Sequence, residues 1–217
     1  MEAQLLENTK LITRAKAAKG LMWLGIISIT MLFAGLTSGY IVRQGEGKWV
    51  QFAMPELFRI STLFIVLSSV TMQWAVVSIR RNNIKNLKIA VALTTVLGVG
   101  FMVFQYFAWS ELVSQGIYFV GQIQDIKAPY EYIRAANESA AEIATTGNVA
   151  GSFLYVITGL HVVHVVGGML ALLFVLVKSM MGKYSASDYS GVSVCAIYWH
   201  FLDGLWVYLF FFLLYIR

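Results

Sequence analysis

Charged residues and cysteine are both scarce in this chain of 217 residues. Only 12% of its residues are charged, against about 25% in soluble globular domains, and 59% are hydrophobic. The single cysteine, Cys195, lies in an apolar segment, which excludes an internal disulfide and a cysteine-based metal cluster. The composition therefore predicts an integral membrane protein and leaves its redox compartment open.

Several motifs with known chemistry are missing as well. The sequence has no glycine-rich phosphate loop, no serine or cysteine nucleophile at a suggestive distance from a base, and no His-Glu-x-x-His zinc pattern. The net charge is +5, but the basic residues are spread through short connections, so nucleic acid is not an expected partner. The polar start, MEAQLLENTK, is unlike a signal peptide, and we expect the first membrane helix to direct its own insertion.

Long apolar stretches dominate the rest of the chain. Each of the five is long enough to cross a bilayer as a helix, which takes about 20 residues. We therefore predict an all-α membrane protein, a bundle of five transmembrane helices in a single domain over residues 1–217. The expected spans are residues 21–42, 57–79, 88–112, 151–177 and 192–216. The long outer loop, residues 113–150, is expected to cap one end and to contain a short helix that stops near Gly147.

Lysine and arginine are unevenly divided between the two sides of this predicted bundle. By the positive-inside rule, the side with more of them in short connections is the cytoplasmic side. That side is the side of the N-terminus, so the N-terminus is predicted to be cytoplasmic and the C-terminus periplasmic. Ten of the sixteen basic residues fall there: Lys10, Arg14, Lys16, Lys19, Arg80, Arg81, Lys85, Lys88, Lys178 and Lys183.

All three histidines lie within the last two predicted spans. The stretch TGLHVVHVVGG, residues 158–168, places two of them one turn apart on one side of a helix, and the third shares a face with an aspartate in the last span. Unpaired polar groups are costly in hydrocarbon, so such side chains should face the bundle interior and find partners there. The candidate site residues are His161, His164, His200, Asp203, Thr158 and Trp199.

Three roles are open for these residues. The histidines could bind a haem or a transition metal, but bulky valine and leucine flank them and would obstruct a haem ring. A proton relay, or a small transporter with His161 and Asp203 as coupling groups, would need more titratable groups across the bilayer. The residue pattern itself favours hydrogen bonds between helices, with no metal bound.

Two stretches resemble the last two helices of subunit III of haem–copper terminal oxidases. They are SFLYVITGLHVVHVVGG, residues 152–168, and YWHFLDGLWVYLF, residues 198–210. The second is the more specific, because it reproduces the family pattern Tyr-Trp-His-Phe-x-Asp-x-x-Trp. MLFAGLTSGYIV, residues 31–42, and LSSVTMQWA, residues 67–75, are similar to earlier parts of the family. Five spans with a cytoplasmic N-terminus are similar to the short bacterial form.

Two positions depart from the family pattern. Ser28 is followed by Ile29 where the family usually has an acidic residue, and Ala108 stands where it has a glutamate. Roles that depend on those two carboxylates therefore cannot be carried over to this chain.

The resemblance implies a cofactor-free accessory subunit that is not itself catalytic. Haem and copper would belong to the partner subunits I and II of a proton-pumping cytochrome c oxidase, which serves aerobic respiration in the bacterial inner membrane. This chain would pack beside those subunits, bind phospholipid and support proton uptake, and the six candidate residues would form a buried polar network or contact lipid. Subunit III of a quinol oxidase is the alternative, and the loop 113–150 could contact another respiratory complex.

Overall fold

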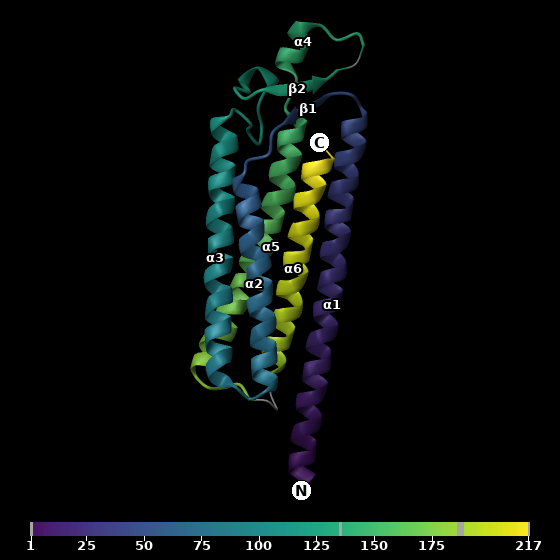
Figure 1. Cartoon of the computed structure of the whole chain (residues 1–217). Helices are drawn as coiled ribbons and strands as arrows, with labels where there is room; N and C mark the ends of the chain where they lie inside the picture. Colours follow the sequence, from purple (N-terminus) through teal and green to yellow (C-terminus); the bar gives the residue numbers. More distant parts are fainter. Residues whose placement is uncertain (1, 135, 186–188, 217) are drawn as a thin grey trace.

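Five long helices run side by side in the computed structural model, and a small cap covers one end of them (Figure 1). The structure describes residues 2–134, 136–185 and 189–216. Within these residues, five helices are long and apolar enough to cross a membrane, which confirms the predicted helical class. They are α1 (Glu2–Gly45), α2 (Leu57–Arg80), α3 (Ile84–Ser114), α5 (Val149–Met180) and α6 (Ser190–Tyr215).

A tight turn joins α2 to α3. Asn82 adopts a positive φ of 55°, a conformation that asparagine tolerates better than most side chains. Asn83 then caps α3, since its side-chain oxygen accepts a hydrogen bond from the backbone N–H of Asn86 at 3.1 Å. The two helices therefore run antiparallel and pack closely along their length.

The helix α1 packs less closely than the others. It lies mainly against α5 and α6, and its buried hydrophobic residues Ile26, Phe33 and Tyr40 follow one another at seven-residue spacing along one face. Most of its other described side chains are exposed. The N-terminal part of α1 extends past the ends of the other helices (Figure 1).

Glycine lets the α3, α5 and α6 helices approach closely around one tryptophan. A Cβ atom at Gly98 of α3 would lie 2.9 Å from Trp199 Cη2 and 2.5 Å from Met169 Cε. A Cβ atom at Gly168 of α5 would lie 3.3 Å from the same tryptophan ring. Trp199 is 1% exposed, so these glycines make room for a large buried side chain.

The cap contains a small antiparallel sheet, which the predicted bundle of helices did not include. Strand β1 (Trp49–Phe52) pairs with β2 (Tyr130–Ile133), with Trp49 opposite Ile133 and Phe52 opposite Tyr130. The cap also holds a 3-10 turn, η1 (Ile123–Asp125), and the short helix α4 (Ala140–Thr145). The sheet could not be foreseen because each strand has four residues and its partner lies in a different connection.

Candidate functional site

His161 lies in a cage of aromatic rings at the centre of the bundle. Its ring centroid is 6.3 Å from that of Phe33, 6.1 Å from that of Phe101 and 5.1 Å from that of Trp206, so α1, α3 and α6 all contribute. The residue is 0% exposed, and neither ring nitrogen has a hydrogen-bond partner among the described residues. The arrangement makes His161 a packing residue in this chain.

The other two candidates on α5 are bonded locally or to α3. His164 Nδ1 lies 2.7 Å from the backbone oxygen of Leu160, one turn earlier in the same helix. The Thr158 hydroxyl donates to the backbone oxygen of Leu154 at 2.7 Å and accepts a hydrogen bond from Trp109 Nε1 at 3.2 Å. Thr158 therefore ties α5 to α3.

The candidates on α6 face α2. His200 Nδ1 lies 2.7 Å from the hydroxyl oxygen of Ser69, and the Ser69 side chain also lies close to the Asp203 carboxyl group. Asp203 is 4% exposed, and neither carboxylate oxygen has a hydrogen-bond partner in the part of the chain that the structure describes. Trp199 Nε1 donates to the Ser68 hydroxyl at 3.0 Å. These contacts join the polar face of α6 to neighbouring serines of α2.

The hydrogen bonds of the six predicted residues either reach a neighbouring helix or stay within the residue's own helix. None joins two of the six to each other within residues 2–134, 136–185 and 189–216. Sequence reasoning missed the serines and threonine of α2 that provide the partners, Ser68, Ser69 and Thr62, the last of which accepts from Trp206 Nε1 at 3.0 Å. Ser68 and Ser69 stand in the stretch LSSVT, where Ser68 is buried and Ser69 is partly buried, and Thr62 precedes that stretch.

The described residues do not gather the donors that a metal ion needs. No group of three or more histidine, cysteine, aspartate or glutamate side chains among them is placed to hold one. His161 sits in its aromatic cage and His200 is bonded to α2, so the donors point to different neighbours. That the chain itself binds no metal stays a prediction.

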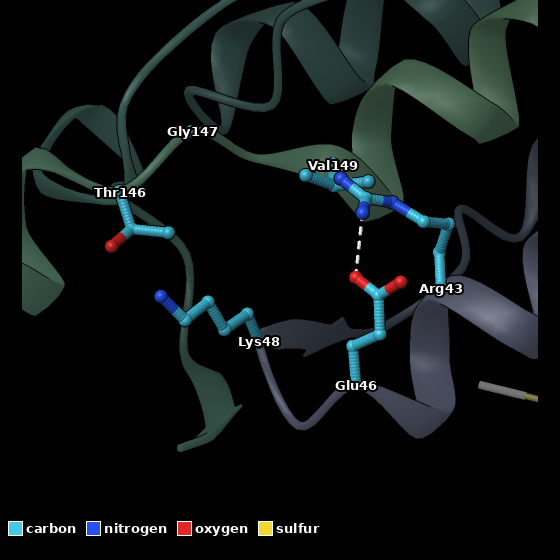
Figure 2. Close-up of a pocket in the computed structure, with 6 residues that line it drawn as sticks. All are labelled: Arg43, Glu46, Lys48, Thr146, Gly147 and Val149. Atoms are coloured by element: carbon cyan, nitrogen blue, oxygen red, sulfur yellow. Dashed lines mark hydrogen bonds and ion pairs between the residues drawn. The ribbon is translucent and has the colours of Figure 1, made fainter. Parts of the chain in front are cut away.

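A pocket opens on the cap, between the end of α1 and the start of α5. It has a volume of about 420 Å³ and its charged lining residues are Arg43, Glu46 and Lys48 (Figure 2). Arg43 pairs with Glu46, and Lys48 Nζ lies 3.1 Å from a carboxylate oxygen of Glu138. The hydrogen bond and charge of Glu138 raise the pKa of Lys48 above its ordinary value. Both basic side chains are therefore already paired, and the cap is braced against the end of α1.

Comparison with known proteins finds similarity to one family. A family model described as cytochrome c oxidase subunit III matches residues 115–217. A probable cytochrome c oxidase subunit 3 of Mycobacterium leprae (strain TN) is 28% identical over 200 residues, which cover 90% of this chain and 85% of that protein. Over these residues the chain is similar to the cytochrome c oxidase subunit III family. The match confirms the resemblance noted in the sequence.

Other relatives extend the similarity over most of the chain. The cytochrome c oxidase subunit 3 of Thermostichus vulcanus is 29% identical over 193 residues, covering 85% of this chain and 80% of that protein. The cytochrome c oxidase subunit 3 of a Synechocystis species is 29% identical over 191 residues, which cover 85% of this chain and 70% of that protein. All six candidate residues lie within the part matched by the subunit III family model. Together with this similarity, the five long apolar helices among the described residues indicate a multi-pass membrane protein.

Proposed function

We propose that this chain is the accessory subunit III of a proton-pumping haem–copper oxidase in the bacterial cytoplasmic membrane. The observation that carries the proposal is its match to the subunit III family over residues 115–217, together with named cytochrome c oxidase subunits that align with 85 to 90% of it. Oxygen would be reduced at the haem and copper of partner subunits I and II. In this proposal the chain binds neither group.

The polar side chains inside the bundle support an indirect role. Trp199 and His200 bond to α2 and Thr158 bonds to α3, so these groups are engaged in holding helices together. Interhelical hydrogen bonds of this kind stabilise membrane bundles by roughly 0.6–2 kcal/mol each. We propose that the chain stabilises subunit I and its surroundings, without making or breaking bonds in the substrate itself.

Phospholipid is the second proposed partner. Of the six candidates, only His164 and His200 are partly exposed, so these two are placed to reach a lipid. The other four are buried inside the bundle. We further propose that the chain supports proton uptake by the catalytic subunit. Cytochrome c is the proposed electron donor, since the aligned relatives are named cytochrome c oxidase subunits; a quinol oxidase is the alternative.

The test compares the oxidase isolated from cells with and without this chain. We expect the complex without it to keep its haem spectrum and to begin oxidising cytochrome c, but to lose activity sooner during turnover. A control preparation restored with the full-length chain should regain its durability. Stoichiometric haem bound to the purified chain alone, or oxygen consumption by it, would overturn the proposal.

A further inference from the structure

An exposed apolar loop follows α3 at the cap end of the bundle. Phe119 is 55% exposed and Val120 is 81% exposed, and both lie outside the five long apolar helices. Val120 is more exposed than any other large hydrophobic side chain that the structure describes. Contact with water carries a free-energy cost for such side chains, and exposed apolar surface of this kind marks a site of contact.

The loop begins with a turn that directs the chain from α3 to α5. Gly116 adopts a positive φ of 83°, and its N–H donates to the Val113 oxygen at 3.0 Å. The N–H of Ile117 donates to the Leu112 oxygen at 3.0 Å, which completes a common helix-ending motif. Ile117 is fully buried, and a Cβ atom at Gly151 of α5 would lie 3.1 Å from its Cγ2 atom. The loop is therefore packed against α5 at this point.

Two hydroxyl groups of α5 fix the level of the loop along the bundle. The Tyr155 hydroxyl donates to the backbone oxygen of Ile117 at 2.8 Å, and the Ser152 hydroxyl donates to that of Phe119 at 2.6 Å. These two α5 residues lie about 9 and 4.5 Å along the helix from Val149, its first residue. The loop therefore lies beside the first two turns of α5, with two of its backbone carbonyls satisfied.

The length of α5 places this level at the boundary of the membrane. With 32 residues the helix is about 48 Å long, whereas the hydrocarbon core of a bilayer is about 30 Å thick. Divided between the two ends, the excess is about 9 Å at each, which is the stretch that includes Ser152 and Tyr155. The rings of Tyr155 and Trp109 lie here with their centroids 6.4 Å apart, and these residue types are typical of the membrane boundary.

We propose that Phe119 and Val120 insert into the headgroup region of the leaflet on the cap side and anchor the cap to the bilayer. The partner is the membrane surface, and no single bound lipid is required. The segment QGIYFVG, residues 115–121, carries no charge that would oppose insertion. It also continues the exposed apolar surface of α3, where Tyr106 is 67% and Val113 is 45% exposed. This contact does not depend on which complex the chain joins.

Fluorescence quenching measures the depth of the loop. Val120→Cys or Ala141→Cys is labelled with an environment-sensitive fluorophore, and the full-length chain is placed in phosphatidylcholine vesicles containing lipid with a nitroxide near its headgroup. Ala141 is exposed on α4, which lies at the far end of the cap and provides the control (Figure 1). The native Cys195 is 5% exposed and should react little.

We expect the nitroxide lipid to quench the label at residue 120 at least about twofold more strongly than the label at residue 141. Iodide in the aqueous phase should quench the two labels in the reverse order. Equal quenching of both labels by the lipid, or stronger quenching by iodide at residue 120, would overturn the proposal. In the chain purified together with its native partners, the lipid quenching at residue 120 should persist. Its loss there would mean that a protein covers the loop, which would also overturn the proposal.

Phe119→Asp tests whether the neighbouring ring helps to hold the loop at this depth. A carboxylate is costly at the edge of the hydrocarbon, so it should lower lipid quenching of the label at Val120→Cys. Phe119→Leu keeps an apolar side chain and should leave the quenching unchanged. Equal quenching in the two variants would contradict insertion, and thermal unfolding of both verifies that the bundle is intact.

Discussion

His161 is a polar side chain in an apolar position. Neither ring nitrogen has a hydrogen-bond partner among the described residues, which carries a desolvation cost, while the three surrounding aromatic rings gain contact with the imidazole. The residue therefore stabilises the bundle by filling space. The contacts of the surrounding core offset the free-energy cost of burying its two ring nitrogens.

The substitutions His161→Leu and His161→Ala separate the effect of the side chain's volume on stability from the effect of its polar atoms. Leucine fills a similar space without polar atoms, so the free energy of unfolding should stay within about 1 kcal/mol of the unsubstituted chain. Alanine leaves a cavity and should lower it by about 2–4 kcal/mol. Thermal unfolding in mild detergent measures both. A leucine variant as unstable as the alanine variant would mean that the imidazole nitrogens have an essential partner.

Gly98→Ala tests the close approach around Trp199. The added methyl group would meet Trp199 Cη2 at 2.9 Å, and because this ring is fully enclosed, we expect a loss of about 1–3 kcal/mol in unfolding free energy. Gly159→Ala is the matched control in a helix interior, since a Cβ atom there would have no other atom within 4 Å. It should be neutral or stabilising by up to about 1 kcal/mol. Equal effects of the two substitutions on thermal unfolding would contradict the packing described.

The sequence was sufficient to predict where polar side chains lie, but it did not identify their partners. Helical spacing correctly placed His200, Asp203 and Trp199 on the last helix, because period alone decides which residues share a face. It could not identify Ser69, which lies 131 residues from His200 along the chain. Such contacts depend on which helices pack together and at what rotation, and neither follows from the pattern of one helix.

The short helix α4 depends on a reciprocal cap at its start. The backbone N–H and the hydroxyl of Ser139 both donate to Glu142, at 2.9 and 3.0 Å, and the Glu142 backbone N–H donates to the Ser139 hydroxyl. These bonds favour the charged carboxylate and lower the pKa of Glu142 below its ordinary value of 4.5. The contribution to helix stability is present above pH 4.5 and is lost as the pH falls through the lowered pKa.

Hydrogen exchange of residues 140–145 measures this dependence. Protection of α4 should fall on acidification below pH 4.5, and Ser139→Ala should reduce protection at neutral pH while moving the Glu142 pKa back towards its ordinary value. Ser139→Thr keeps the hydroxyl and serves as the control. Unchanged protection in the alanine variant would show that the cap does not stabilise α4.

Hydropathy and length predicted the long helices well, because each is apolar over more than the thickness of a bilayer. The cap was harder to predict. Strand β1 includes the buried Trp49 and Val50, but its partner β2 is largely exposed and its residues do not alternate between buried and exposed. A pairing of two four-residue strands from separate connections has almost no local signature.

The orientation of the whole bundle is a separate prediction. Lys127 lies on the cap and Lys183 at the opposite end, and both are exposed. In intact spheroplasts, a membrane-impermeant maleimide should label Lys127→Cys, whereas Lys183→Cys should react only after the membrane is opened. The native Cys195 is 5% exposed and should give little background. The reverse labelling pattern would invert the topology.

Co-purification is the most direct measurement of the central claim, that this chain works as an accessory subunit of an oxidase. The tagged full-length chain is isolated from native membranes in mild detergent, and the eluate is analysed by mass spectrometry and by a reduced-minus-oxidised visible spectrum. We expect oxidase subunits I and II in the eluate, with haem bands in proportion to subunit I. Haem bands from the chain alone, or a colourless chain without oxidase subunits, would contradict it.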